Sequence, residues 1–301
     1  MNKKRILSGM QPSGQLHLGN YFGALKSWIA LQNEYDCFFF VADWHALTSL
    51  YENPQRIKPF SFEVAVDWLS SGLDPEKCTL FVQSGIPEHA ELHLILSMIV
   101  PVPWLERNPT YKEKQVEGGN LDMSSYGFLG YPVLQTSDIV LYKAHMVPVG
   151  IDQSPHLELS REIVRRFNTL YKKDLFIEPE AKISDVPKLG GVDGRKMSKS
   201  YNNAIYLSDS EADVRGKIQA MVTDPQRKRR NDPGDPNICN LYPFHKLYSP
   251  KATQDEIDAD CRTAAIGCTD CKKKLMDNMV AEMRPHMEKR KDIISKPGKV
   301  W

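Results

Sequence analysis

The sequence lacks an excess of charge of either sign. Its 39 lysines and arginines are matched by 38 aspartates and glutamates, so the formal net charge of the 301 residues is +1. This balance excludes a protein that binds nucleic acid or membranes through its overall charge, and any such contact must depend on a local basic patch. At this length the chain suits one large or two ordinary domains and can bury a substantial core.

Long apolar runs are also missing. The chain begins with basic residues and leads within a few positions into a short strand pattern, without the apolar segment of a signal peptide or a membrane span. We therefore expect a cytoplasmic protein that makes no membrane contact.

Cysteine is scarce, with six residues, and in a reducing compartment it does not form structural disulfides. Cys37 and Cys78 lie in or beside predicted strands, where they serve as small core residues. The other four follow the pattern Cys-x21-Cys-x6-Cys-x2-Cys: Cys239, Cys261, Cys268 and Cys271. This set predicts a metal site, and the spacing leaves Zn²⁺ and a [4Fe-4S] cluster equally open because both bind four thiolates. His245 is interpreted as a packed or surface residue.

Glycine and proline are concentrated at residues 9–20. The preceding Arg5–Ser8 is typical of a buried strand, and Tyr21–Leu31 repeats apolar residues at helical spacing. This order places His17 and its neighbours at a helix N-terminus, whose free N–H groups attract phosphate. The turn has neither the P-loop ending nor the glycine spacing of the dinucleotide fold. A turn that needs glycine only for its backbone is the alternative.

Strands and helices alternate over the first two thirds of the chain. Strands are predicted at 36–43, 79–83 and 146–150, and helices at 54–71, 87–98, 131–142 and from 154 to about 171. This alternation predicts an α/β fold with a doubly wound, Rossmann-like parallel sheet, whose ligands bind beyond the carboxyl ends of the strands. Past Tyr206 the pattern predicts an α-helical domain with helices at 210–221, 254–265 and 272–294.

Residues 196–200 read Lys-Met-Ser-Lys-Ser after a glycine-rich loop at 185–195. Lysines on a loop are often only solvated charges, but they also suit the binding and release of a polyphosphate. With the turn at 9–20, this segment resembles the HIGH and KMSKS motifs of class I aminoacyl-tRNA synthetases. The form of the first motif, the turn at 150–153 and the helix at 131–142 resemble the tryptophanyl-tRNA synthetases over nearly the whole chain.

The resemblance implies that ATP with Mg²⁺, L-tryptophan and tRNA(Trp) are the substrates and that the protein is a homodimer. Catalytic roles fall to His17, Lys114, Lys196 and Lys199. ATP binding is assigned to Gln11, Pro12, Ser13, Gly19, Asn20, Gly150, Ile151, Asp152 and Lys196, Met197, Ser198, Lys199, Ser200. Tryptophan binding is assigned to Asp138, as acceptor of the indole N–H, and to Tyr131, Gln135 and Gln153.

The same resemblance assigns residues 1–206 to a nucleotide- and amino-acid-binding catalytic domain. An insertion at about 101–143 would contribute to the dimer interface. Residues 207–301 would form a tRNA anticodon-binding domain that carries the four cysteines. That domain resembles the bacterial branch with a [4Fe-4S] cluster, which favours iron–sulfur over Zn²⁺. A further helix is implied after Lys299, close to where the sequence ends.

Several alternatives remain at this point. Asp138 is interpreted without the family as an exposed residue on a polar helix face. Basic residues at 227–230 and 272–274 suit either solvated helix ends or contact with phosphates. A tyrosyl-tRNA synthetase has the same fold, and a non-catalytic RNA-binding or redox-sensing paralogue, or a simple nucleotidyltransferase, would share parts of the pattern.

Overall fold

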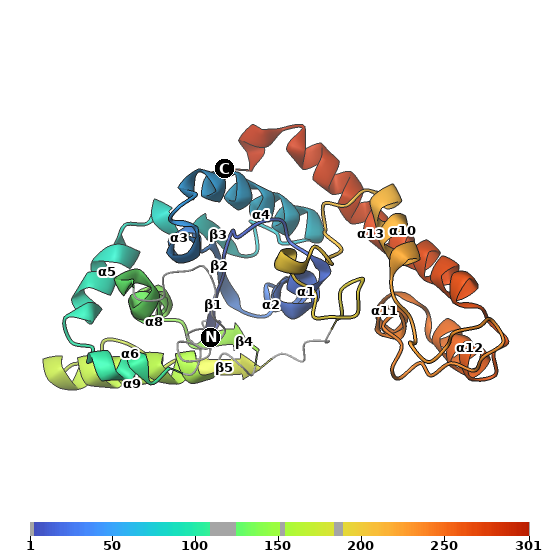
Figure 1. Cartoon of the computed structure of the whole chain (residues 1–301). Coiled ribbons are helices and arrows are strands. Elements are labelled where there is room, and N and C mark those ends of the chain that lie inside the picture. Colours follow the sequence, from blue (N-terminus) through green and yellow to red (C-terminus); the bar gives the residue numbers. More distant parts are fainter. Residues whose placement is uncertain (1–2, 109–124, 151–153, 184–188, 301) are drawn as a thin grey trace. The chain divides into compact units, whose positions relative to one another are not determined.

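The computed structural model describes residues 3–108, 125–150, 154–183 and 189–300 (Figure 1). The chain divides into two compact units. The first comprises Met1–Ser13 and Gly23–Val186, and the second comprises Gly14–Phe22 and Pro187–Trp301. A short N-terminal segment therefore folds with the C-terminal third of the chain, a grouping that no local pattern indicated.

The first unit is built on a parallel sheet of five strands in the order β3-β2-β1-β4-β5. The strands are β1 (Arg5–Met10), β2 (Asp36–Val41), β3 (Thr79–Val82), β4 (Met146–Val149) and β5 (Glu180–Ile183). The strand order reverses between β1 and β4, as in doubly wound sheets, and the predicted fold class is confirmed. The edge strand β5 escaped prediction because its four residues are mostly exposed and half of them are charged.

Helices follow the strands in the first unit. They are α2 (Lys26–Leu31), α3 (Asp43–Leu50), α4 (Ile57–Ser71), α5 (Glu88–Ser97), α6 (Val102–Glu106), α8 (Tyr126–Leu141) and α9 (Ser154–Tyr171), with 3₁₀ turns at Pro54–Arg56 and Gln83–Gly85. Helix α4 ends at Gly72, whose φ of +115° requires glycine. The helix predicted from residue 54 begins as the 3₁₀ turn at Pro54, and the Asn53 side chain before it makes no capping hydrogen bond.

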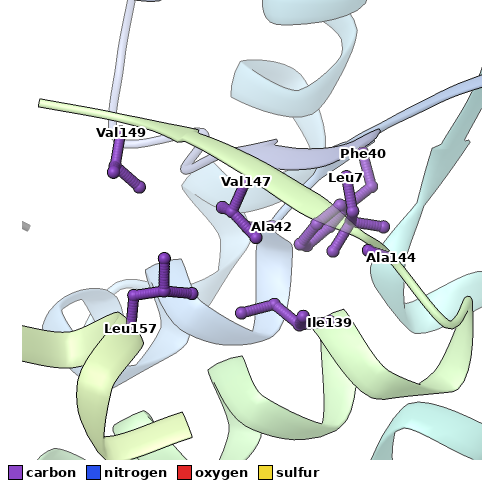
Figure 2. Close-up of a cluster of buried hydrophobic side chains, with 8 residues drawn as sticks. All are labelled: Leu7, Phe40, Ala42, Ile139, Ala144, Val147, Val149 and Leu157. Atoms are coloured by element: carbon purple, nitrogen blue, oxygen red, sulfur yellow. The ribbon is translucent and has the colours of Figure 1, made fainter. Parts of the chain in front are cut away.

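Both faces of the sheet are covered, as the apolar strand β2 requires. On one face, Leu7, Phe40 and Val147 pack with Ile139 of α8 and Leu157 of α9, and Figure 2 shows these side chains gathered between the strands and the helices. On the other face, Trp28 of α2 stacks on Phe39 with ring centroids 4.6 Å apart and meets Trp68 of α4 edge-on. Because successive residues of β2 point to opposite faces, one strand serves both cores.

The second unit is helical. Its helices are α1 (Leu18–Asn20), α10 (Glu211–Ala220), α11 (Tyr242–Tyr248), α12 (Lys251–Arg262) and α13 (Cys268–Ile294), with 3₁₀ turns at Lys199–Tyr201 and Pro297–Lys299. The first helical turn continues through a π-helical segment at Tyr21–Leu25 into α2. Buried Val214 and Ile218 of α10 face α13, whose Leu275 and Met279 are also buried. Helix α11 escaped prediction because it is only seven residues long.

Backbone hydrogen bonds join residues 14–22 to the rest of the second unit. The Leu18 N–H donates to the carbonyl of Ile205 at 3.0 Å, and the Leu207 N–H donates to the carbonyl of Leu16 at 2.9 Å. His17 and Tyr206 form an isolated antiparallel bridge between these bonds. Two segments nearly 190 residues apart in sequence are thus held side by side. None of the helices in the described ranges is long and apolar enough to cross a membrane.

Candidate active site

The first-motif turn depends on two glycines. Gly14 has a φ of +135°, and a side chain there would also come within 3.3 Å of the Lys199 aliphatic chain. A Cβ at Gly19 would lie 2.8 Å from the imidazole of His17. The turn therefore brings the backbone close to one lysine and one histidine of the two predicted motifs.

His17 caps the helix that it precedes. Its backbone N–H donates to Asn20 Oδ1 at 3.1 Å, and the Asn20 N–H donates to His17 Nδ1 at 3.3 Å. Because Nδ1 accepts, the ring proton of the neutral imidazole is on Nε2. Burial, and next the positive charge of Lys199, lower the pKa of His17 to about 4. At neutral pH this side chain is an uncharged donor and cannot act as a cationic phosphate clamp.

The Lys196–Ser200 loop is held from inside by Asn203, which is 2% exposed. Asn203 Oδ1 accepts from the Ser198 N–H at 2.9 Å, while its Nδ2 donates to the carbonyl of Lys196 at 3.1 Å and to Asp193 Oδ1 at 2.7 Å. Met197 is buried and Lys196 is exposed. Asn203 was not predicted as a site residue, because the sequence around it does not indicate that its side-chain amide binds the backbone of the loop.

A cavity of about 520 Å³ opens in the first unit at the carboxyl ends of β1 and β4. Five of the residues predicted to bind ligands line it: Gln11, Tyr131, Gln135, Asp138 and Gly150. Apolar side chains such as Leu7 and Val149 make up much of the remaining wall. A cavity of this size, lined by both apolar and polar side chains, suits one small aromatic ligand that carries polar groups.

Asp138 of α8 is 1% exposed, so the interpretation of it as a surface residue is wrong. Its Oδ2 accepts from His45 Nε2 at 2.7 Å, and its Oδ1 accepts from His89 Nδ1 at 2.7 Å and from Gln83 Nε2 at 2.8 Å. Burial alone would raise the pKa of Asp138, but the hydrogen bonds and charges of His45 and His89 lower it. The group is a carboxylate at neutral pH.

Four polar residues of this site were missed from the sequence. His45, Gln83 and His89 surround Asp138, and His156 of α9 lies 3.1 Å from the Tyr131 hydroxyl. Gln83 directly follows β3, and His45 follows β2 by four residues. Their position at the carboxyl ends of parallel strands was a usable signal, because ligands of such sheets bind there.

Four predicted site residues, Lys114, Ile151, Asp152 and Gln153, lie outside the described residues. Pro12 is buried in the turn after β1, and the Ser13 N–H donates to the carbonyl of Gln11 at 2.9 Å.

Comparisons with known proteins agree on the family. The model for "tRNA synthetases class I (W and Y)" matches residues 1–283. The chain belongs to the class I tRNA synthetases for tryptophan and tyrosine. The tryptophan–tRNA ligase of Thermotoga maritima is 51% identical over 295 residues, which cover 97% of this chain and 90% of the relative.

Solved structures give the same result. A crystal structure of tryptophanyl-tRNA synthetase from Campylobacter jejuni, in complex with ADP and tryptophan, matches with a TM-score of 0.88 at 36% identity over 98% of this chain and 91% of that chain. The tyrosyl-tRNA synthetase of Archaeoglobus fulgidus, with L-tyrosine, matches with a TM-score of 0.71 at 19% identity over 96% and 90% of the two chains. That second likeness shows a shared fold.

The four cysteines of the synthetase lie near one another in the second unit. Burial, and then the charges of Cys239, Cys261 and Cys268, raise the pKa of Cys271 to about 12. The structure brings His245, which is fully buried, to 3.3 Å from Cys271 Sγ, so it is packed against the set rather than exposed. Among the described residues, however, the side chains are not arranged around a common metal position.

The basic residues beside the cysteines have internal partners. Arg227 donates to the carbonyl of Ile266 at 2.7 Å, and Arg230 donates to those of Ala264 and Ala265 at 2.6 and 3.0 Å. These carbonyls follow the end of α12, where backbone acceptors lack helical partners. The two arginines therefore stabilise the synthetase fold around the cysteines, which limits the basic surface that this segment offers to phosphates.

Proposed function

We propose that this synthetase is a tryptophan–tRNA ligase, which activates L-tryptophan with ATP and transfers it to the 3′ end of tRNA(Trp). The observation that carries the proposal is Asp138, a buried carboxylate that lines a cavity large enough for an aromatic amino acid. Such a group accepts the indole N–H, whereas phenylalanine would leave it unpaired. As a supplier of aminoacyl-tRNA for translation, the protein is expected in the cytoplasm.

The activation step needs no general base. The tryptophan carboxylate is ionised at neutral pH and attacks the α-phosphorus of ATP. A carboxylate oxygen–phosphorus bond forms, the bond from the α-phosphorus to the bridging oxygen breaks, and pyrophosphate leaves with the electron pair. The tRNA ribose hydroxyl then attacks the adenylate carbonyl, loses its proton and releases AMP.

Charge development on pyrophosphate is the part that side chains must stabilise. Lys196, Lys199 and Lys114 are proposed to contact the phosphates, with Mg²⁺ bound to ATP. Neutral His17 would donate from Nε2. The remaining proposed ATP contacts are Gln11, Pro12, Ser13, Gly19, Asn20, Gly150, Ile151, Asp152, Met197, Ser198 and Ser200.

The amino-acid pocket is proposed to bind tryptophan at both ends. Asp138 would accept from the indole N–H, and Tyr131, Gln135 and Gln153 would hold the ammonium group. The three described residues of this set line the same cavity.

Pyrophosphate exchange with tryptophan and with tyrosine in parallel tests the function. We expect exchange with tryptophan and a rate at least about 10³-fold lower with tyrosine, because Asp138 is placed to accept a hydrogen bond from the indole N–H. Exchange that prefers tyrosine would identify the sister enzyme. No exchange with either amino acid would leave a non-catalytic RNA-binding or redox-sensing protein and refute the proposal.

We also propose that Cys239, Cys261, Cys268 and Cys271 hold a [4Fe-4S] cluster. Three observations support a cluster at these cysteines. The charges of the other three thiols raise the pKa of Cys271, the Thr223 hydroxyl lies 3.7 Å from Cys268 Sγ, and an Arg227 amino group lies 3.9 Å from Cys261 Sγ. Such donors favour sulfur that carries negative charge. A cluster there would order the surrounding loops and support tRNA binding. About four irons per chain are expected in anaerobically purified protein; one Zn²⁺ per chain would overturn the assignment.

A homodimer is proposed through the surface of α5, α6 and the start of α8. Exposed apolar side chains gather on these elements, namely Leu94, Ile95, Met98, Val102 and Tyr126, with Met98 74% exposed. An apolar surface of this kind is typical of subunit contacts. Sedimentation velocity should show a dimer that Met98→Asp weakens at least about tenfold. The matched variant Ile238→Asp, at an exposed position in the second unit, should leave the dimer intact.

Residues 207–301 are proposed to bind the tRNA anticodon, with residues 1–206 as the catalytic domain and the segment at about 101–143 at the dimer interface. Arg227 and Arg230 are engaged with backbone, whereas Lys228, Arg229 and Lys273 are exposed. These three are the residues that we expect to contact phosphates. Replacing all three by glutamine should weaken tRNA(Trp) binding and flatten its salt dependence.

A further inference from the structure

The hydrogen bonds around Asp138 are unevenly shared between its two oxygens. Oδ1 accepts from both Gln83 and His89, which fills its two lone pairs. Oδ2 accepts from His45, its one partner within the described chain. One acceptor position therefore remains on Oδ2, and both Asp138 and His45 line the cavity.

His89 connects this carboxylate to Tyr142. Its ring is fully buried, with Nδ1 at 2.7 Å from Asp138 Oδ1 and Nε2 at 2.9 Å from the Tyr142 hydroxyl. The ring also packs against Phe81 and Tyr142, with centroids 5.9 and 5.5 Å away. This packing restricts rotation of the imidazole, so each ring nitrogen keeps its partner.

The partners determine where the protons lie. An ionised carboxylate can only accept, so His89 carries a proton on Nδ1, and in the neutral imidazole Nε2 is then an acceptor. Tyr142 supplies that second bond as a donor. Burial, and next the charge of Asp138, raise the pKa of Tyr142, so its hydroxyl keeps the proton that it donates.

The other tautomer of His89 would change the pocket. With its proton on Nε2, the imidazole would present a bare Nδ1 to Asp138. Two acceptors 2.7 Å apart repel unless the carboxyl group binds a proton. A neutral carboxyl group is a weaker acceptor for an indole N–H than a carboxylate.

We propose that Tyr142 is a positioning residue for amino-acid selection, which acts through His89 by holding that imidazole in its Nδ1–H tautomer. Asp138 is thereby kept as a carboxylate whose remaining acceptor position is reserved for the indole N–H. This inference rests on the proposed role of Asp138 in tryptophan binding. It adds Tyr142, on the far side of His89 from the carboxylate, to the groups that set selectivity.

The test compares two substrates of the same shape in the pyrophosphate exchange assay. One is L-tryptophan, and the other is β-(3-benzothienyl)-L-alanine, in which sulfur replaces the indole N–H. The measured quantity is the ratio of their kcat/KM values. Tyr142→Phe should lower this ratio about tenfold, through the KM for tryptophan and with kcat little changed. Tyr171→Phe, which removes the hydroxyl of an exposed tyrosine at the end of α9, should leave the ratio unchanged.

A second background separates the tautomer effect from simple packing. His89→Asn retains an N–H donor in place of Nδ1 and, as an amide, has no second tautomer. Tyr142→Phe should therefore lower the ratio in the wild-type background and have no further effect in the His89→Asn background. A loss of the same size in both backgrounds would show that Tyr142 acts only by packing, and would overturn the proposal.

Asp138→Asn in the same assay distinguishes this inference from the function on which it rests. If Asp138→Asn leaves the ratio unchanged, the proposed role of the carboxylate fails and the inference fails with it. If Asp138→Asn lowers the ratio and Tyr142→Phe does not, the role of the carboxylate stands and the Tyr142 inference alone is refuted. Thermal unfolding of each variant confirms that the ratios are compared between folded proteins.

Discussion

The Asp138 site in the first unit is a buried cluster of ionisable groups and the four-cysteine set in the second unit is a partly buried one, and in the two clusters burial has opposite results. Around Asp138, donors from two histidines outweigh desolvation and lower the pKa. Around Cys271, desolvation and the neighbouring thiols act together and raise the pKa to about 12. A buried anion is stable where the fold itself supplies donors, and the environment of Cys271 instead favours its neutral thiol.

The strongest test of this comparison removes the charge of Asp138. Asp138→Asn keeps the size but turns one acceptor oxygen into a donor that opposes a histidine N–H. We expect kcat/KM for tryptophan in pyrophosphate exchange to fall about 1000-fold, with ATP binding retained. The exposed Asp174→Asn serves as the control. Unchanged kinetics in Asp138→Asn would mean that the carboxylate only stabilises the fold.

The two lysines of the Lys196–Ser200 loop should behave differently from the buried carboxylate. Lys196→Ala and Lys199→Ala should each lower kcat for exchange about 100-fold, because one preorganised donor to a developing charge contributes about 3 kcal/mol. Tryptophan affinity, measured by fluorescence titration, should change little. Equal losses in affinity and in rate would contradict a role confined to the leaving pyrophosphate.

The cysteine set is tested by Cys268→Ser. We expect loss of the bound iron and of the visible absorbance, and a fall in tRNA(Trp) charging of about tenfold, because the loops that the cluster orders would support tRNA. Tryptophan-dependent exchange should persist, since it depends on the first unit and the lysine loop. Cys78→Ser, at a buried cysteine outside the set, should keep its iron. Loss of exchange in Cys268→Ser would refute this separation of roles.

The pH dependence of stability should differ between the two clusters. The pKa of Asp138 is lower in the folded chain, so its contribution is present above the unfolded value and lost as the pH falls through the folded value. The pKa of Cys271 is raised from 9.0 to about 12, so the metal-free protein should lose stability as the pH rises between these values. The slope for one thiol is at most about 1.4 kcal/mol per pH unit. Urea unfolding of metal-free wild type and Cys271→Ala, whose slope should be smaller, measures it.

The smallest effects concern two glycines, one near each cluster. The atoms nearest to a Cβ at Gly130 in α8 would be those of the Tyr126 ring, at 3.6 Å or more, so Gly130→Ala should raise the free energy of unfolding by about 0.5–1 kcal/mol and leave exchange unchanged. A Cβ at Gly234 would come within 2.6 Å of Cys261 Sγ, so Gly234→Ala should reduce iron content. Full iron content in Gly234→Ala would show that Cys261 has room to move.

Local sequence patterns were sufficient to predict features that depend on interactions between residues close in sequence. The strand predicted at 36–43 corresponds to β2, the helix predicted at 54–71 ends where α4 ends, and the glycines at residues 9–20 lie in the predicted turn. The two motifs and the spacing of the cysteines predict a nucleotide site and a metal site, and both stay predictions. The strand, the helix and the turn depend on residues within a few positions of one another.

Tertiary structure alone decided which polar groups meet. Asp138 looked like a surface residue because nothing in α8 itself supplies donors; His45, Gln83 and His89 reach it from segments 49 to 93 residues away in sequence. The side chain of Asn203 binds the backbone of the Lys196–Ser200 loop. Backbone hydrogen bonds join residues 14–22 to the rest of the second unit. The sequence determined the strands, helices and motifs because propensity and periodicity act locally. Long-range contacts decided that Asp138 is ionised, because a buried carboxylate is stabilised by the hydrogen-bond donors that the fold places beside it.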